Sequence, residues 1–358
     1  MGVVGWASHR FLPVFSLDVE RCNSWPDRPL PARGKFMNNP NTNGQHATFR
    51  NPLNNGPDPF LTFHNGRYYL STTAGNVSLP MWAAPSLSEL ATASPITIWS
   101  EADHPERASQ LWAPSFYLID GHWYLYYTAD DGHDANHRIY VAQSVGSDPL
   151  GPYSFTARLA TPIDDLWAID PALLRWGGEL YILWCGAGHE GHNLLYIAPM
   201  SNPWTISGPR VYLPAAGGCP EVREAPSIIY HNDSAFLIYS TCDTGKPDYQ
   251  LWMKILPAGA NPLEAAQWQQ HPGPVFTRYD PAGVYGPGSN AFFRSPDGQE
   301  DWIVYHAKTT SAYTYDGRTT RAQKITWKAD GSPNLGAPIA LDVAIPLPSG
   351  DPSLVPID

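Results

Sequence analysis

The chain has 358 residues, of which 43% are hydrophobic and 13% aromatic, with 37 prolines, 30 glycines and a formal net charge of −11. This charge argues against binding to nucleic acid or to an anionic membrane, because both require a basic surface. No stretch approaches the roughly 18 apolar residues needed to span a bilayer. The proline and glycine content indicates many turns and few helices.

Residues 1–46 are irregular and rich in proline, asparagine and arginine, so we expect an N-terminal extension. Its first 17 residues do not form a convincing signal peptide, because charged and proline residues interrupt the apolar run and no positive segment precedes it. The sequons Asn76-Val77-Ser78 and Asn232-Asp233-Ser234 are compatible with secretion, and we expect a secreted protein.

From residue 47 onward the chain repeats. Four prolines, at positions 59, 114, 171 and 226, are spaced 55, 57 and 55 residues apart. Each is followed by a turn pair: Asn65-Gly66, Asp120-Gly121, Gly177-Gly178 and Asn232-Asp233. After each turn comes a run rich in aromatic and branched residues: 67–70, 123–127, 180–184 and 236–239. A fifth, looser copy extends from Gly288 through Asp297-Gly298 to Tyr305.

A period of this length, with hairpins in each unit, is typical of radially repeated sheets. Further strand patterns at 138–142 and 193–198 bring each unit to about four strands. We therefore predict an all-β, five-bladed β-propeller in a single domain over residues 47–345, followed by a tail over 346–358. A last hairpin, 321–327 with Asp330-Gly331, is expected to complete the ring with the N-terminal strand. Residues 86–91 are expected to form one short helical turn.

Three carboxylates stand at or beside the same point of the repeat: Asp58, Asp170 and Glu224. In a propeller the starts of all the inner strands meet near one axis, so these groups should lie together. An Asp before Pro is often only a turn or cap residue. However, three acids in matching positions with apolar neighbours favour a functional site, because buried charges are costly without partners.

The chain resembles glycoside hydrolase family 43, the five-bladed propeller enzymes that act on arabinose- and xylose-containing polysaccharides. The matching stretches are 56–60, 112–114, 167–170, 224–226, 285–290 and 301–306, in order and at this spacing. The run 197–204, Ile-Ala-Pro-Met-Ser-Asn-Pro-Trp, resembles the α-L-arabinofuranosidase branch. The resemblance departs at Ser115, where many relatives carry an acid, and at Ala225, where many carry glycine. Both departures bear on substrate preference.

The resemblance implies an inverting hydrolysis in which Asp58 is the general base, Glu224 the general acid, and Asp170 the group that modulates the acid's pKa. Such a reaction requires one ionised and one protonated carboxyl group on opposite sides of the glycosidic bond. Glu221 is the rival acid, although its neighbours lack the family context.

The resemblance also implies substrate contacts from Phe60, Trp112, Arg321 and Asn290, and a place on the propeller axis for His306. Phe60 and Trp112 could equally pack in the core, Arg321 could be a solvated strand charge, and His306 a hydrogen-bonded core histidine. We expect no required cofactor. The resemblance also allows a structural calcium ion or another cation beside His306, on the propeller axis.

The predicted activity is that of an exo-acting α-L-arabinofuranosidase on arabinan or arabinoxylan fragments. The alternatives are a β-xylosidase or endo-arabinanase on the same scaffold, and a non-catalytic glycan-binding propeller. The expected partner is a neutral polysaccharide or oligosaccharide, and the expected state is a monomer.

Two further patterns are weaker. His189-Glu190-Gly191-His192 does not match a zinc-protease helix, because its histidines are three residues apart. Of the four cysteines, Cys219 and Cys242 could pair, and buried free thiols are an equal alternative.

Overall fold

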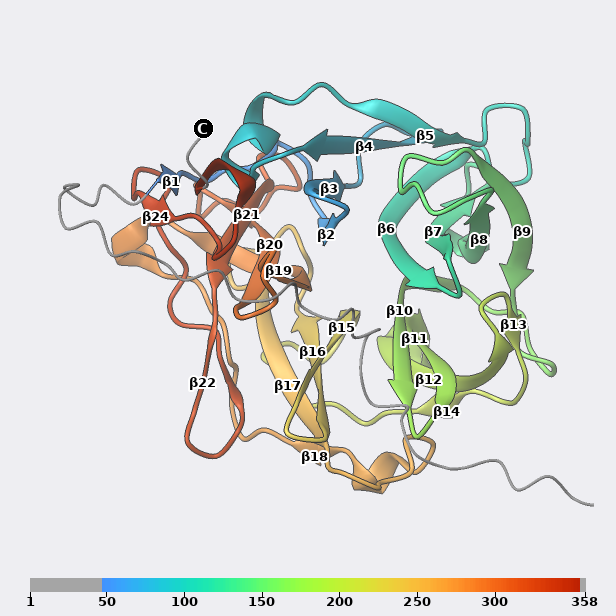
Figure 1. The fold of residues 1–358 in the computed structure, drawn as a ribbon. Helices are drawn as coiled ribbons and strands as arrows, with labels where there is room; N and C mark the ends of the chain where they lie inside the picture. Colours follow the sequence, from blue (N-terminus) through green and yellow to red (C-terminus); the bar gives the residue numbers. More distant parts are fainter. Residues whose placement is uncertain (1–46, 355–358) are drawn as a thin grey trace, which may run out of the picture. The chain divides into compact units, whose positions relative to one another are not determined.

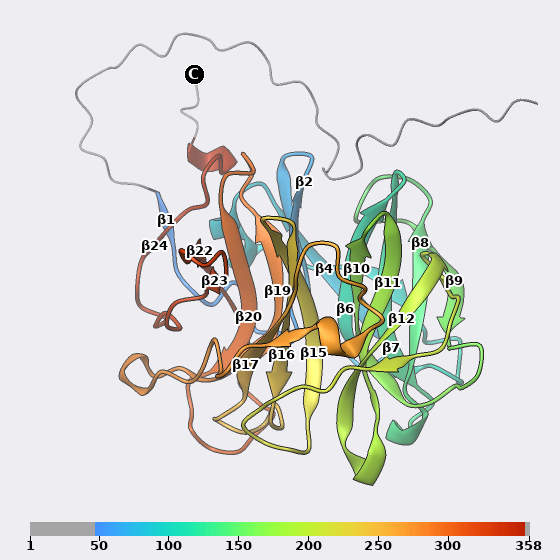
Figure 2. The ribbon, with the colours of Figure 1, turned by 90° about the horizontal axis from the view of Figure 1, so that it is seen from below.

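A computed structural model describes residues 47–354, which form 24 strands and six short 3-10 helices. Residues 1–46, predicted as an N-terminal extension, and 355–358 lie outside the described part. Most of the strands belong to five antiparallel sheets arranged around an axis as the blades of a propeller (Figure 1). Seen from the side, the long strands run roughly along this axis (Figure 2). The predicted fold class is confirmed.

Each blade begins with its innermost strand. Blade 1 contains β2 Phe60–His64, β3 Arg67–Ser71, β4 Ser78–Ala84 and β5 Ile96–Ser100. Blade 2 contains β6 Ser109–Ile119, β7 His122–Asp130, β8 Arg138–Ser144 and β9 Tyr153–Leu159. Blade 3 contains β10 Ala168–Trp176, β11 Glu179–Ala187, β12 Asn193–Asn202, β13 Thr205–Ile206 and β14 Val211–Tyr212.

Blade 4 contains β15 Arg223–His231, β16 Ser234–Thr241, β17 Gln250–Leu256 and β18 Gln269–Gln270. Blade 5 contains β19 Tyr285–Arg294, β20 Asp301–Lys308 and β21 Thr319–Lys324. The 3-10 helices are η1 Leu87–Thr92, η2 Asp134–Asn136, η3 His189–Gly191, η4 Ala265–Gln267, η5 Asp280–Ala282 and η6 Pro352–Leu354. Helix η1 is the predicted short turn.

The turn pairs join the first two strands of each blade. In Asn65-Gly66 both residues have positive φ, 45° and 80°, as a two-residue type I′ turn requires. The pairs at 120–121, 177–178 and 232–233 share this conformation. The local sequence therefore fixes the register of these hairpins. The register in turn fixes where each inner strand begins relative to the second strand of its blade.

The ring closes through the segment before β2. Leu53 N–H donates to the Thr320 carbonyl at 2.8 Å, and Thr320 N–H donates to the Asn54 carbonyl at 2.8 Å. Residues 51–54 thus lie along β21. The predicted last hairpin forms as β22 Thr326–Trp327 with β23 Pro333–Asn334, but in a sheet of its own. Strand β1, Thr48–Phe49, pairs instead with β24, Ile345–Pro346.

Five hydrophobic clusters hold the blades together, and each is shared by two neighbouring blades. One cluster joins Leu61 and Tyr68 of blade 1 to Phe293 and Trp302 of blade 5.

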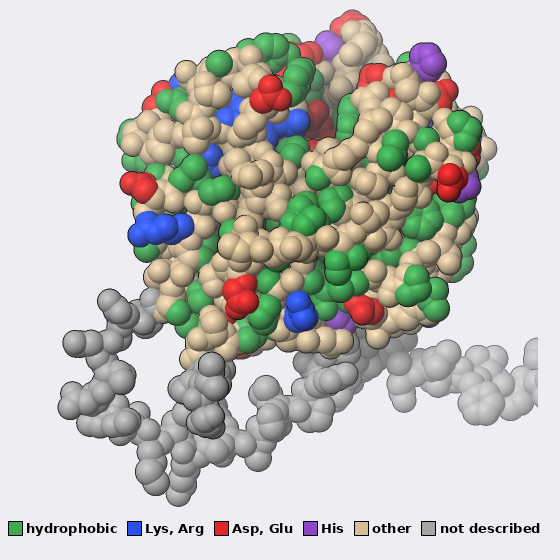
Figure 3. Space-filling model, turned by 90° about the horizontal axis from the view of Figure 1, so that it is seen from above, with side chains coloured by type: hydrophobic (Ala, Val, Ile, Leu, Met, Phe, Trp, Pro, Cys, Tyr) green, Lys and Arg blue, Asp and Glu red, His purple; other side chains and the backbone are tan. Residues whose placement is uncertain are grey.

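Charged side chains are scattered on the face shown in Figure 3. None of the described helices has the length and apolar character of a membrane span.

Candidate active site

The inner strands share one backbone feature at the point where the repeats align. A non-glycine residue there has positive φ: Asp58 (54°), Ala113 (47°), Asp170 (56°), Ala225 (48°) and Ser289 (47°). The left-handed conformation costs such a residue about 1–2 kcal/mol. In β6, β10, β15 and β19 the strand register shifts at this point. Bulges of this kind re-aim side chains and are frequent beside active sites.

A cavity of about 50 Å³ lies where these five segments meet. Its lining includes Asp58, Phe60, Asp170, Ser289 and Asn290. That volume is enough for ordered water. A larger hollow of about 570 Å³, lined by residues 52–57 with Thr73, Ala74, Trp82 and Ala91, contains no titratable side chain. Asp58 and Asp170 line the smaller cavity, whereas Glu224 does not line it and directly precedes the lining residue Ala225 on β15.

Asp58 is held in its ionised form. Its carboxylate Oδ1 lies 3.3 Å from Nδ1 of His306 and 4.0 Å from Nη1 of Arg318. Burial alone would raise the pKa of Asp58, but the neighbouring His306 and Arg318 outweigh this effect and hold the pKa well below its usual range. An ionised carboxylate in this position can accept a proton.

His306 is fully buried and both of its ring nitrogens are engaged. Nδ1 lies 3.2 Å from the backbone nitrogen of Asp58 and 3.3 Å from its Oδ1, and Nε2 lies 3.1 Å from Thr244 Oγ1. Burial lowers the pKa of His306, which favours the neutral ring over the charged imidazolium. These contacts leave no free imidazole nitrogen for a cation, and with Arg318 close by they do not fit a calcium ion bound directly to the ring.

Asp170 and Glu224 form an interacting pair of partly buried carboxyl groups. The Ala225 N–H donates to Oδ2 of Asp170 at 2.9 Å, and the Tyr249 hydroxyl donates to Oε1 of Glu224 at 2.8 Å. Burial and the charge of Asp170 raise the pKa of Glu224 well above its usual value. Burial and the charge of Asp58 raise the pKa of Asp170. Because two close carboxylates resist ionising together, a proton is retained on the pair.

The three predicted acids therefore occur in two protonation states around one site. Asp58 has a lowered pKa, and Glu224 and Asp170 have raised ones. Groups whose environments move their pKa values apart can serve as base and acid in one reaction. By contrast, Glu221 lies about 40% exposed and forms an ion pair with Lys246 at 2.8 Å, which lowers the pKa of Glu221. An ionised, exposed carboxylate is poorly suited to donate a proton.

The other predicted residues occupy different environments. Phe60 lines the cavity and packs against Phe116, with ring centroids 4.8 Å apart. Asn290 also lines it, is 6% exposed, and has no hydrogen-bond partner for either amide atom. An unpaired buried amide is costly, and a bound polar group would satisfy it.

Trp112 and Arg321 do not line this cavity. Trp112 is partly buried, and its ring lies 4.3 Å from that of His137. Arg321 is fully buried, and its guanidinium donates to Thr319 Oγ1 and the Ala307 carbonyl. Arg318, which precedes β21 at the rim, is the arginine beside Asp58.

Sequence reasoning missed three residues that contact the acids or their partners: Thr244, Tyr249 and Arg318. Arg318 stands in the motif 318–321, but the strand boundary that separates it from Arg321 was not evident. Tyr249 and Thr244 come from the loop between β16 and β17, outside the repeated pattern. Tyr249 also stacks on His306, with ring centroids 5.5 Å apart and planes 8° apart.

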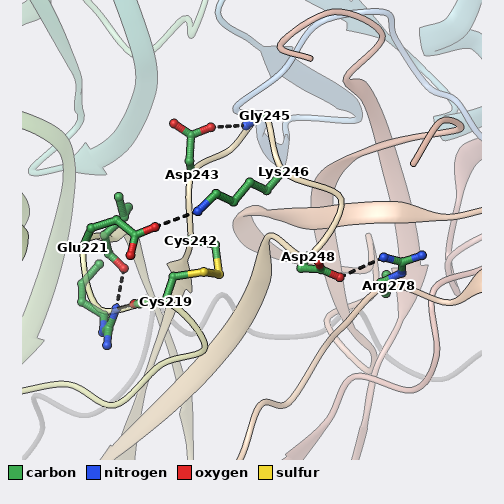
Figure 4. Close-up of a disulfide and its surroundings, with 10 residues drawn as sticks. Cys219, Glu221, Cys242, Asp243, Gly245, Lys246, Asp248 and Arg278 are labelled. Atoms are coloured by element: carbon green, nitrogen blue, oxygen red, sulfur yellow. Dashed lines mark hydrogen bonds and ion pairs between the residues drawn. A yellow bond between two sulfur atoms is a disulfide. The ribbon is translucent and has the colours of Figure 1, made fainter. Parts of the chain in front are cut away.

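A disulfide joins Cys219 to Cys242, so the pairing that the sequence left open is present. It connects the segment before β15 to the start of the β16–β17 loop (Figure 4). Strand β15 itself carries Glu224. Cys185 is a buried free thiol.

One group among residues 47–354 could hold a metal ion: His189, Glu190 and His192 in the β11–β12 loop, with one ligand atom of each within 4.8 Å of the others. A single 3-10 turn carries them, so the group lacks the helix of a zinc protease.

Comparison with known proteins identifies the family of this chain. Residues 49–333 match the family described as Glycosyl hydrolases family 43. An extracellular exo-α-(1→5)-L-arabinofuranosidase of Streptomyces avermitilis is 35% identical over 313 residues, covering 82% of this chain and 64% of the relative. α-L-Arabinofuranosidase 43 of Humicola insolens is 30% identical, covering 79% of this chain and 62% of the relative.

The chain thus spans somewhat less than two thirds of the length of these two relatives. Among solved structures, α-L-arabinofuranosidase from Lactobacillus brevis superposes with a TM-score of 0.77 at 29% identity, covering 82% of this chain and 98% of that one. The family match covers most of the chain, and the same segments build the acidic site. The chain belongs to glycosyl hydrolase family 43.

Proposed function

We propose that this chain is an inverting, exo-acting α-L-arabinofuranosidase that releases terminal arabinose from arabinan or arabinoxylan side chains. The observation that carries the proposal is the opposite displacement of the pKa values of Asp58 and Glu224 at one site. The names of the two curated relatives and of the Lactobacillus brevis enzyme support the sugar.

The reaction is a single displacement. Asp58 removes a proton from a water molecule, whose oxygen attacks the anomeric carbon as the glycosidic bond breaks. Glu224 gives its proton to the departing oxygen, so the leaving chain departs as a neutral alcohol and Asp58 holds the water's proton. Inversion requires about 6.5–9.5 Å between the two carboxyl groups to leave room for water.

The remaining groups maintain the two protonation states. The charge of Asp170 keeps the proton on Glu224, and its bond from Ala225 N–H fixes the backbone next to the acid. His306 and Arg318 keep Asp58 ionised. Tyr249 occupies Oε1 of Glu224, which leaves Oε2 as the oxygen that delivers the proton.

The substrate is a neutral glycan, and we propose that the protein works outside the cell. Two relatives are named extracellular, and a disulfide persists in oxidising compartments. The acidic net charge of −11 does not favour anionic polysaccharides.

The test is release of arabinose from linear α-1,5-arabino-oligosaccharides by the wild type, with Asp58→Asn and Glu224→Gln as inactive controls from the same preparation. Arabinose from the wild type alone supports the proposal. Xylose from xylo-oligosaccharides would indicate a β-xylosidase, and arabinobiose or longer products an endo-arabinanase. No release from any of these would favour a non-catalytic glycan-binding propeller.

A further inference from the structure

The loop between β20 and β21, residues 309–318, stands at the same rim as the acidic site. Tyr285 at the start of β19 pairs with Lys308 at the end of β20. Ser289 and Asn290, which line the cavity, follow Tyr285 in the same inner strand. The loop that follows Lys308 must therefore begin at the rim where the inner strands begin.

This loop carries two exposed tyrosines. Tyr313 is 61% exposed and Tyr315 is 51% exposed. Their hydroxyl oxygens are 3.0 Å apart, and the Tyr315 hydroxyl donates to Oδ2 of Asp243 at 2.9 Å. The ring centroids are 5.8 Å apart, with planes inclined by 62°. The pair thus forms a fixed aromatic surface, named here the tyrosine platform, that faces solvent.

Gly245, on the β16–β17 loop, lies directly beneath the two rings of the tyrosine platform. A Cβ at this position would lie 2.9 Å from the ring of Tyr313 and 3.2 Å from the ring of Tyr315. The Gly245 N–H donates to Oδ1 of Asp243 at 2.7 Å (Figure 4), and its carbonyl accepts from Thr314 N–H at 3.0 Å. Only glycine lets both rings rest on this backbone.

A buried lysine fixes the two loops to each other. Lys308 is fully buried, and its ammonium donates to the carbonyls of Gly245, Ala312 and Thr314. All three N–H donors are used, so the lysine has no free donor for catalysis. Its effect is to hold the tyrosine platform in place before any ligand binds, which reduces the ordering cost of binding.

The same loops reach both catalytic carboxyl groups. Arg318, at the end of the tyrosine loop, donates through Nε to the Tyr315 carbonyl at 2.9 Å, and its Nη1 lies 4.0 Å from Asp58. Tyr249, at the end of the β16–β17 loop, donates to Glu224. Arg318 therefore links the tyrosine platform to the base Asp58, and the β16–β17 loop links it to the acid Glu224.

We propose that Tyr313 and Tyr315 form a binding subsite for a pentose unit of the leaving chain, beyond the bond that is cleaved. This rests on the proposed function. Aromatic rings bind apolar surface with a polar handle at the edge, and a pentose offers CH groups flanked by hydroxyls. The leaving-group side follows from the general acid, because the loop that supports the platform also carries the hydroxyl that orients Glu224.

The test compares two substrates in each variant: α-L-arabinofuranosyl fluoride, whose leaving group is a single atom that cannot occupy the subsite, and α-1,5-arabinotriose. The measured quantity is the ratio of kcat/KM on the triose to kcat/KM on the fluoride. In Tyr313→Ala we expect this ratio to fall about three- to tenfold, the range for loss of one aromatic contact. Gly245→Ala should lower it as well, although both tyrosines remain, because its Cβ displaces their rings.

Tyr230→Ala is the matched control. Tyr230 is 44% exposed and lies near the far end of β15, at the opposite rim. Its ratio should stay at the wild-type value. An unchanged ratio in both Tyr313→Ala and Gly245→Ala would overturn the proposal. Equal losses on both substrates would also overturn it, since they would indicate a structural role only.

Calorimetric titration of arabinotriose into Glu224→Gln separates binding from turnover. Adding Tyr313→Ala to that variant should raise the dissociation constant about three- to tenfold. If the wild type cleaves neither substrate, the proposed function fails and this titration alone decides the platform. A dissociation constant that Tyr313→Ala leaves unchanged, or no binding of arabinotriose, would contradict the subsite.

Discussion

Replacing Tyr249 by phenylalanine tests how the acid is controlled. The Tyr249 hydroxyl donates to Oε1 of Glu224 at 2.8 Å, while its ring stacks on His306. Phenylalanine keeps the stacking and removes the hydroxyl, with its hydrogen bond to Glu224 and its contact with Ser240. Such a bond contributes about 1 kcal/mol, so losing it from the oriented acid should lower kcat/KM about fivefold at neutral pH.

The same substitution has a predicted sign in the pH profile. The hydroxyl stabilises the carboxylate form and so lowers the pKa of Glu224, against the larger effects of burial and Asp170 that raise it. Without the hydroxyl, the pKa of Glu224 rises further and the acid keeps its proton to higher pH. The alkaline limb of the kcat/KM profile should therefore move to higher pH.

The assay is the kcat/KM profile on an arabino-oligosaccharide between about pH 4 and 10, with Tyr239→Phe as control. The Tyr239 hydroxyl is equally buried but donates to the Ala216 carbonyl at 2.8 Å, away from the acids. An alkaline limb that moves to lower pH in Tyr249→Phe, or moves equally in Tyr239→Phe, would refute the reasoning.

Three other substitutions test the site. Glu224→Gln should lower kcat/KM about 10²–10⁴-fold for an oligosaccharide but much less for a nitrophenyl leaving group, and equal losses would rule out its role as acid. Asp170→Asn removes the charge that raises the pKa of Glu224, so the alkaline limb should move to lower pH; movement upward would contradict this. Cys242→Ser opens a link across 23 residues, so the free energy of unfolding in urea should fall by about 3 kcal/mol, and no change would mean that the link does not stabilise the fold.

The five-fold repeat was predictable because its signals are local. The pair Asn65-Gly66 and the aromatic runs that follow the turns specify hairpins by themselves, and the hairpins fix where each inner strand begins. That register is what brought Asp58 and Asp170 to equivalent positions. The closure of the ring was less predictable, because residues 51–54 lie along β21 without forming a strand that has a pattern of its own.

The rim could not be predicted in the same way. Tyr249 reaches Glu224, and Arg318 approaches Asp58, from loops that no other blade repeats. These contacts depend on how far each loop folds back over the cavity, which periodicity does not encode. The resemblance drew attention to Arg321, whereas Arg318 is the arginine beside the base, because the sequence did not show that β21 begins between them, at Thr319.

Proton NMR of the products tests the central claim most directly. Time-resolved spectra of the protein with linear α-1,5-arabino-oligosaccharides report the anomer of arabinose that appears before mutarotation. The roles of Asp58 as base and Glu224 as acid in one displacement predict β-arabinose first. Initial release of α-arabinose would contradict them, because retention requires a carboxylate to act as a nucleophile.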